Sequence, residues 1–292
     1  MKLLAKFNLA FIVVFGCGLA IAAYLSQQFL QSDARDQVLR QAALMMETAQ
    51  ASRSYTNQQL KPLLEPEQKT RNIFIPQTVP AFAATESFNY LRKRYPDYTY
   101  KEATLNPTNL RDRAVDWEAD VVNIFRNQQD RKEVTGYRET PDGPTLYLAR
   151  PLRAPEPCLE CHSVPSRAPR PMIKAYGSAN GFGWKPNEVV AAQIVSVPMA
   201  LPVGIANRAF RTLMLYLGLV GLGTLVVLDL ALVSIVIRPV TRLSRAADEI
   251  SKGNLDVPEL PVQGKDEIAG LASSFNRMHV SLKKAIHLLE NE

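Results

Sequence analysis

The sequence predicts a two-span membrane protein with a mixed α/β domain between the spans and a helical coiled-coil segment after the second span. Two apolar stretches, residues 7–25 and 213–237, are each close to the roughly 20 residues that a helix needs to cross the hydrocarbon core. The segment between them, residues 26–212, has the usual size of one domain. After the second stretch, apolar residues recur at spacings of three and four, which is typical of a coiled-coil seam.

The most specific motif lies in the central segment. Cys158-Leu159-Glu160-Cys161-His162 matches C-x-x-C-H, the attachment sequence of a c-type haem, in which two thiols bond the haem and the histidine binds its iron. The whole chain has only three cysteines and three histidines. The alternatives are a redox-active cysteine pair and a zinc site, but the surrounding prolines predict a rigid loop, and a structural zinc site needs four ligands. We therefore expect one covalently attached haem c.

Haem attachment of this kind takes place outside the cytoplasm, so the motif predicts the orientation of the chain. Residues 26–212 are expected outside, in the periplasm, with residues 1–6 and 238–292 in the cytoplasm. Basic residues near the spans favour the same orientation, although Arg208 and Arg211 on the outer side oppose it. The first stretch could instead be a signal peptide, but it lacks a clear cleavage site. We expect a two-pass protein of the inner (plasma) membrane; an internal energy-transducing membrane remains an alternative.

Hydrophobic periodicity predicts the elements of the central domain. A long helix is expected at Ser32–Leu64, ended by Pro62, because residues such as Leu39 and Ala43 share one face. Two further helices are expected at Ala83–Arg94 and Arg111–Gln128. Strands are expected at Tyr98–Ala103, Glu133–Glu139, Leu146–Leu152 and Val189–Val197, with the C-x-x-C-H loop between the last two.

Three short runs, taken in order, give this domain a family resemblance. They are Arg53-Ser54-Tyr55 followed by Pro62, Tyr100-Lys101-Glu102-Ala103 through Asn106-Pro107, and Tyr147-Leu148-Ala149-Arg150-Pro151 leading into the haem motif. Over most of residues 35–200 the sequence resembles the bacterial extracytoplasmic haem c sensor domains of PAS-like fold. The resemblance implies a long N-terminal helix packed on an antiparallel sheet and on the haem.

The iron ligands can be narrowed from the residues. His279 and His287 lie across the membrane, so His162 is the one histidine that can reach the iron within a subunit. Thioether sulfur is a haem ligand, and Met45 or Met46 on the long helix is the candidate for the sixth position, since the resemblance packs that helix on the haem. An open or weakly bound sixth position is the alternative. Arg53 and Arg150 are candidate partners of the haem propionates.

The C-terminal segment has a second family pattern. Arg238-Pro239 follows the span, a first heptad helix ends at Gly253, and a connector with four apolar residues leads to Lys265-Asp266-Glu267 and a second heptad helix. The apolar residues are Val240, Leu243, Ala247 and Ile250 in the first helix, Leu255, Val257, Leu260 and Val262 in the connector, and Ile268, Leu271, Phe275, Met278, Leu282, Ala285 and Leu289 in the second helix.

Over residues 237–290 this pattern resembles a HAMP domain, which implies a parallel dimeric four-helix bundle that relays a change from a membrane sensor to a cytoplasmic effector. We therefore expect at least a homodimer. A dimer also supplies a helix interface at which Asp229, near the middle of the second span, can hydrogen-bond.

Two functions agree with these features. The first is a membrane-bound c-type haem sensor of redox state or of a diatomic gas, which signals through HAMP to an effector such as a histidine kinase acting in trans. The second is a membrane-anchored monohaem cytochrome for electron transfer, for which HAMP has no role beyond dimerisation. No catalytic motif is visible, so we expect a non-enzyme. The net charge of +6 is modest and forms no basic stripe, so nucleic acid is not expected as a partner.

Overall fold

The computed structural model describes residues 3–141 and 143–290. Residues 1–2 and 291–292, at the ends of the predicted cytoplasmic segments, lie outside the described residues. The chain forms two compact units, one of residues 27–209 and one that combines residues 1–26 with residues 210–292.

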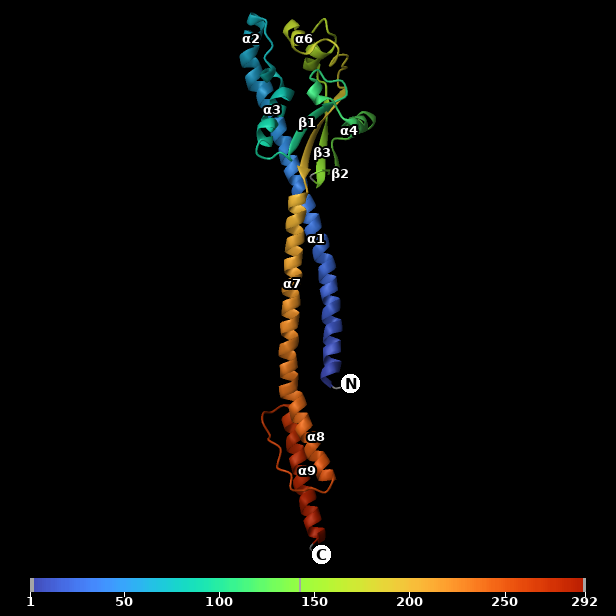
Figure 1. Ribbon diagram of the computed structural model, residues 1–292, viewed down its shortest axis with the longest axis vertical. Coiled ribbons are helices and arrows are strands. Elements are labelled where there is room, and N and C mark those ends of the chain that lie inside the picture. The colour runs from blue at the N-terminus through green and yellow to red at the C-terminus, as the bar shows by residue number, and fades with distance from the viewer. Residues whose placement is uncertain (1–2, 142, 291–292) are drawn as a thin grey trace. The chain divides into compact units, whose positions relative to one another are not determined.

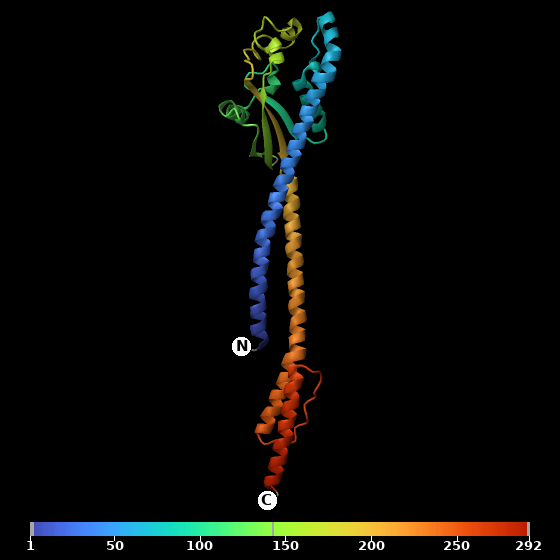
Figure 2. The ribbon, with the colours of Figure 1, turned by 180° about the vertical axis from the view of Figure 1, so that it is seen from behind.

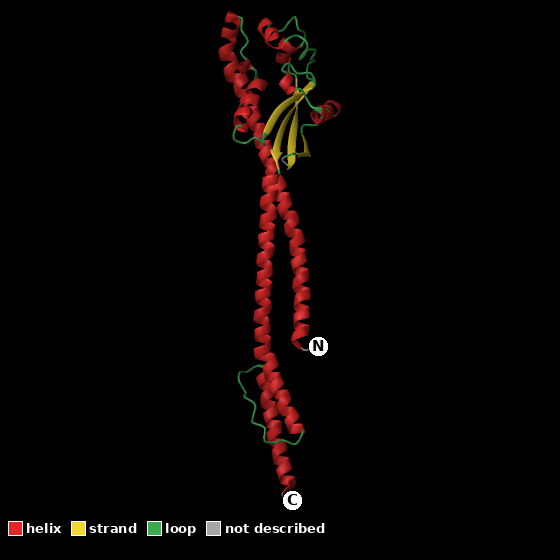
Figure 3. Cartoon of the chain, in the orientation of Figure 1, coloured by secondary structure: helices red, strands yellow, loops and turns green. Residues whose placement is uncertain are grey.

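The unit of residues 27–209 is built on a four-stranded antiparallel sheet (Figure 3). Its strands are β1 (Thr99–Thr104), β2 (Val134–Thr140), β3 (Gly143–Arg153) and β4 (Val189–Pro198), in the order β1-β4-β3-β2. All four predicted strands are confirmed, with ends that differ by a few residues. Because side chains alternate between the two faces of a strand, each face of the sheet can bury its own apolar set.

Helices cover both faces of this sheet (Figure 1). The C-terminal part of α1 (Leu3–Tyr55) and α3 (Pro80–Arg92) cover one face, where Met45, Met46, Phe88, Leu146 and Val195 share one core cluster. On the other face α4 (Asp116–Asn127) packs its buried residues against the strands. The predicted long helix on an antiparallel sheet is confirmed.

The helix predicted at 111–128 begins later than expected. Leu110–Asp112 forms a 3-10 turn, with Asn109 accepting a hydrogen bond from the Arg111 backbone N–H at 3.2 Å, and α4 starts at Asp116. An asparagine that bonds two residues ahead offers the backbone a local alternative to helix, which explains the late start.

The prediction that Pro62 ends the long helix was wrong. A π-helical turn, η1 (Thr56–Leu60), follows α1, and α2 (Lys61–Arg71) continues directly to the left-handed Asn72, whose φ is 51°. Pro62 lies in the first turn of α2 directly after this π-helical turn, where the Lys61 N–H bonds five residues back to the Thr56 oxygen, so the helix passes the proline at a point where its hydrogen-bond register has shifted. The apolar stretch predicted as the first span and the predicted long helix also form one continuous helix, α1. Residues 26–36, which join them, contain no glycine or proline that would interrupt it.

The loop predicted at the C-x-x-C-H motif is partly helical. A 3-10 turn, η4 (Glu156–Cys158), leads into the short helix α5 (Leu159–His162), and α6 (Arg170–Tyr176) follows. The prolines begin these turns and do not prevent them: Pro155 is the residue before η4, and Pro157 lies in its first turn. The motif therefore lies on two tight turns. Its position between β3 and β4 is the one that the sequence predicted.

Two helical stretches, Leu3–Arg71 and Ala200–Ser251, include segments long and apolar enough to cross a membrane. The second consists of α7 (Ala200–Ala231), the π-helical η5 (Leu232–Ile237) and α8 (Arg238–Ser251). The Asn8 side-chain amide donates a hydrogen bond of 3.1 Å to the Asp229 carboxylate. Asp229 therefore bonds across a helix interface within one chain.

The C-terminal part consists of α8, a connector and α9 (Glu267–Glu290), and Figures 1 and 2 show the two helices side by side. Gly253, with φ of +90°, ends α8 as predicted. Leu255, Val257 and Leu260 of the connector pack against the α8–α9 core. Asn276 fixes the connector through both the N–H and the C=O of Leu260, at 3.0 and 2.9 Å.

Val262, the fourth apolar residue of the connector, differs from the other three because its side chain is half-exposed. Val262 follows Pro261 near the end of the connector, beyond the contact that Asn276 makes with Leu260.

Candidate functional site

His162 is held in one orientation by the segment that follows it in the chain. Its Nδ1 lies 2.7 Å from the backbone oxygen of Gly181, and its ring stacks on Trp184 with centroids 4.0 Å apart and planes at 12°. Because a carbonyl oxygen can only accept, Nδ1 must carry the proton, which leaves Nε2 with a free lone pair. Metal-binding histidines typically use this arrangement, with one nitrogen tied to a carbonyl and the other on the metal.

A second loop fixes Gly181 in turn. The Asn106 side chain accepts a hydrogen bond of 3.2 Å from the Gly181 N–H, and the Thr108 hydroxyl lies 3.4 Å from His162 Nδ1. The backbone of Trp184 also bonds to the His162 oxygen at 3.2 Å. The loops at 106–108 and 181–184 thus position the imidazole.

Replacing Gly181 with alanine is expected to destabilise this arrangement. Gly181 has φ of +82°, and an added Cβ would lie 1.9 Å from Thr108 Oγ1 and 2.9 Å from Thr108 Cα. Gly183→Ala is the matched control, because Gly183 has φ of +81° but no atom within 4 Å of such a Cβ. Both variants should lose ~1 kcal/mol or more through backbone strain, and Gly181→Ala about a further 1–3 kcal/mol through the clash. Equal losses in denaturant unfolding would contradict the role of the Thr108 contact.

The two cysteines of the motif are free and half-buried. Burial raises the pKa of the Cys158 thiol, and the nearby positive charges of Arg53 and Lys61 offset part of this rise. Burial likewise raises the pKa of Cys161, with the negative charge of Glu160 acting in the same direction. Both side chains therefore remain protonated thiols at neutral pH; Lys61 lies close enough to influence both, and Arg53 close enough to influence Cys158.

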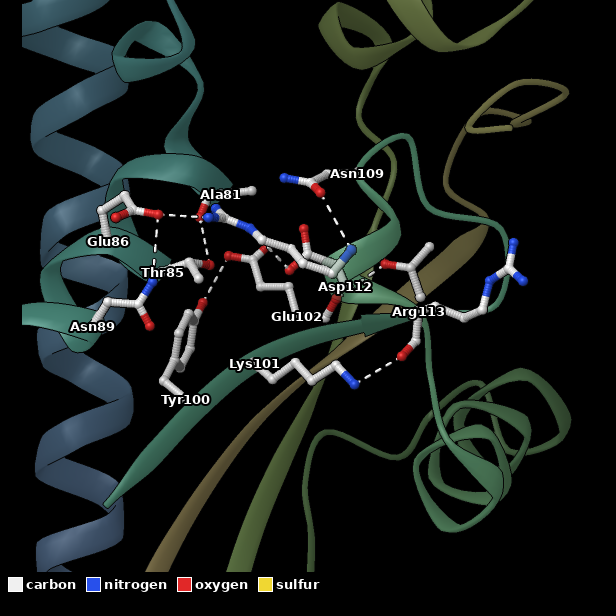
Figure 4. A network of polar contacts seen from close by, with 12 residues as sticks. Ala81, Thr85, Glu86, Asn89, Tyr100, Lys101, Glu102, Asn109, Asp112 and Arg113 are labelled. Atoms are coloured by element: carbon white, nitrogen blue, oxygen red, sulfur yellow. Dashed lines mark hydrogen bonds and ion pairs between the residues drawn. The ribbon is translucent and has the colours of Figure 1, made fainter. Parts of the chain in front are cut away.

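Arg53 belongs to a buried polar network between α1 and the sheet. It forms an ion pair with Glu102, which also accepts a hydrogen bond of 2.7 Å from Tyr100 (Figure 4 shows Glu102 and Tyr100). The amide of Gln193 donates to the Tyr100 hydroxyl at 3.0 Å and to Gln50 at 3.3 Å. Glu102 is only 3% exposed, so the positive charge of Arg53 is what makes its burial tolerable.

Asp112 lies in the same region as Glu102 (Figure 4). Burial raises the pKa of Asp112 from 3.8 to about 6, although Arg111 acts in the opposite direction with its Nε 3.6 Å from the carboxylate. The Asp112 side chain is 20% exposed, so solvent does not remove this effect. The folded protein therefore holds a proton on Asp112 at pH values where the unfolded chain has released it.

This shift predicts a pH dependence of stability. The stabilisation from protonated Asp112 is fully present below about pH 3.8 and is lost as the pH rises through about 6. Asp112→Asn replaces a buried carboxyl that is ionised at pH 7 with a neutral amide. It should therefore raise the free energy of unfolding at pH 7 by ~1–3 kcal/mol and remove this pH dependence. The measurement is denaturant unfolding from pH 4 to 7, followed by the fluorescence of Trp117 and Trp184, the only tryptophans of the chain. A constant difference between variant and wild type across this range would contradict the assignment.

The structure places the other predicted site residues on α1 and β3. Met45 and Met46 are buried in the core between α1 and the sheet, one turn before Gln50. Arg150 bonds to Glu47 at 2.6 Å and to Glu133 at 2.9 Å. Met46 and Arg150 line one cavity together, whereas Arg53 lies beside the motif.

Several residues that build the site were missed from the sequence. Gly181, Trp184 and Thr108 orient His162, and Lys61 lies near both thiols. The run Gly181-Phe182-Gly183-Trp184 is a usable signal, because two glycines around an aromatic residue indicate a tight backbone near a ring. Nothing in the sequence around Lys61 indicates its position, which depends on the π-helical turn.

Comparisons with known proteins match both units of the chain. The family model Tll0287-like matches residues 30–198, and the HAMP domain model matches residues 231–284. The crystal structure of the cyanobacterial haem protein Tll0287 aligns with 55% of this chain and 94% of its own, at 15% identity and a TM-score of 0.41. A search of curated proteins gives no match.

The chain therefore joins a long-helix-on-sheet domain, which contains the C-x-x-C-H motif, to a HAMP domain, the arrangement of a signalling protein. It belongs to the Tll0287-like family.

Proposed function

We propose that this protein is a membrane-bound sensor with one covalently attached haem c, which responds to redox state or to a diatomic gas. The observation that carries the proposal is the His162 side chain, whose Nδ1 is bonded to Gly181 and whose Nε2 is free, directly after two unpaired thiols. The residues present fit the cofactor, because a c-type haem needs two thiols and one oriented imidazole.

Each residue has a distinct role in this proposal. Cys158 and Cys161 hold the cofactor through thioether bonds, and His162 is the fifth iron ligand. Arg53 and Arg150 are the proposed partners of the propionates, although both already bond to glutamates in this structure. When bound, the haem supplies an iron centre that changes oxidation state or binds a gas.

The proposed topology places residues 26–212 in the periplasm and the HAMP domain in the cytoplasm, with spans at 7–25 and 213–237 in the inner membrane. Two apolar helical stretches support it. The extracytoplasmic domain is proposed to have a PAS-like fold, which the four-stranded antiparallel sheet supports.

A homodimer is the proposed state of the protein. Leu271, Met278 and Leu282 form an exposed apolar stripe on α9, while Ala272, Phe275 and His279 face the core of the same chain. A second copy that covers the stripe would complete a four-helix bundle. The bundle would then pass the signal to a cytoplasmic effector, such as a histidine kinase acting in trans.

The sixth iron position is proposed to be Met45 or Met46, or else open. Met46→Ala is expected to lower stability by ~2–4 kcal/mol in either case, because this side chain is fully buried. Met45→Leu and Met46→Leu keep the packing volume and remove the thioether, so they isolate ligation. A change in the reduced Soret and α bands of one leucine variant would identify that methionine as ligand, and unchanged spectra in both would leave the position open.

Absorption spectra of the protein matured with a c-type haem assembly system test the sensor proposal. They are recorded oxidised and reduced, with and without carbon monoxide and nitric oxide. Rapid binding of gas to the reduced protein would favour gas sensing, and a low-spin spectrum unaffected by gas would favour redox sensing. Absence of a haem spectrum would overturn the proposal. A change of oxidation state or gas binding at the haem that has no effect on the HAMP domain would favour the electron-transfer cytochrome.

A further inference from the structure

A cavity of about 430 Å³ lies against the central strands β3 and β4, and neither thiol of the motif lines it. Residues from α1, β3, β4 and the loop between α4 and β2 line it, and its size is within the range of small-molecule sites. Its floor and walls include Met46, Gln193, Asp130, Arg131, Lys132, Arg150 and Arg153.

Three of its cations have no carboxylate within ion-pair distance in the described part of the chain. Arg153 donates only to backbone oxygens, those of Gln129 at 2.6 Å and Asn187 at 3.3 Å. Arg131 donates to the side-chain oxygen of Gln128 at 2.9 Å and to a backbone oxygen at 3.4 Å. These neutral acceptors fix both guanidinium planes without cancelling their charge, and Lys132 adds a third positive charge.

The fourth cation, Arg150, has partners that an incoming anion can replace. Its carboxylate partners Glu47 and Glu133 are 61% and 41% exposed, and exposed ion pairs contribute at most ~1 kcal/mol. Asp130 is an acid in the lining and opposes an anion. When Glu47 and Glu133 are counted together with Asp130, the site has four cationic and three acidic side chains. One positive charge therefore remains in excess.

We propose that this cavity binds carboxylate groups, with Arg153 and Arg131 as the anchoring forks and Met46 as an apolar floor for a short carbon chain. Planar, two-pronged recognition of a carboxylate is what a fixed guanidinium provides. The carboxylate has two possible sources, a free small carboxylic acid or a propionate of the haem. Only the second source depends on the proposed function.

Calorimetric titration of the full haem-loaded chain with succinate tests the proposal, with neutral succinamide as the control ligand. Arg153→Ala should weaken succinate binding about tenfold or more, since a charged hydrogen-bonding partner is lost. Arg94→Ala is the matched control, because Arg94 is exposed and does not line the cavity. Lys132→Glu, at an exposed position, should also weaken binding and tests the charge requirement in case Arg153→Ala misfolds.

The outcomes separate the two sources. Succinate binding that Arg153→Ala weakens and Arg94→Ala does not identifies a free carboxylic acid. If succinate gives no heat but Arg153→Ala changes the pH dependence of the haem midpoint potential, a propionate occupies the cavity. If succinate does not bind and that pH dependence is the same in wild type, Arg153→Ala and Lys132→Glu, the proposal is wrong. Haem content measured beforehand by absorbance shows separately whether the haem assignment has failed.

Discussion

Replacement of both Cys158 and Cys161 by alanine is expected to abolish covalently attached haem. The two half-buried thiols lie on consecutive tight turns directly before His162, and a c-type haem depends on bonds to both sulfurs. Haem staining after denaturing electrophoresis measures attachment, because noncovalent haem is lost under these conditions. The double variant should give no stained band.

The third cysteine supplies the control for this experiment. Cys17 lies in the first apolar helix, outside the motif, so Cys17→Ala should retain full haem staining. Staining that persists in the Cys158→Ala/Cys161→Ala protein would show that the motif does not attach haem. Loss of staining in Cys17→Ala as well would point to poor expression or maturation.

Arg53→Ala is expected to have the largest effect on stability among the single substitutions in the domain. It leaves the carboxylate of Glu102 buried without its cation, and such unpaired buried charges cost ~3–5 kcal/mol. Denaturant unfolding of the full chain, followed by tryptophan fluorescence, measures the loss. Both tryptophans lie in the unit of residues 27–209, so the signal reports on this unit.

Two further variants separate the charge effect from other roles of Arg53. Glu102→Gln in the Arg53→Ala background should recover much of the lost stability, because it removes the unpaired charge. Arg150→Ala should cost ~1 kcal/mol or less, since its partners are largely exposed. If Arg53→Ala and Arg150→Ala had the same small effect, Glu102 would not depend on Arg53.

The parts of this architecture that the sequence predicted are those with strong local periodicity. The strands are short runs with β-branched or aromatic residues, nearly continuously apolar in β4, and the two C-terminal helices repeat at spacings of three and four, so both followed from side-chain pattern alone. The C-x-x-C-H motif is equally local. The position of Gly253 at the end of α8 followed from its freedom to adopt a positive φ.

The parts that could not be predicted depend on contacts between distant residues. The Thr56–Leu60 π-helical turn allows the chain to pass Pro62 without ending the helix, and no local pattern indicates that turn. The orientation of His162 depends on Gly181 and Asn106, which are far from it in the chain. The pairing of Arg53 with Glu102 similarly required the packing of α1 on β1.

The most direct test of the sensor account is the rate at which a bismaleimide, which needs no oxidant, crosslinks Leu271→Cys in a Cys17→Ser background, measured in membranes with the haem oxidised, reduced or reduced under carbon monoxide. Leu271 lies on the exposed apolar stripe of α9 proposed to meet a second copy. The account predicts crosslinked dimers whose rate of formation differs between haem states, and loss of that difference in the Cys158→Ala/Cys161→Ala protein. A rate that is the same in all haem states, or a protein that stays monomeric, would contradict it.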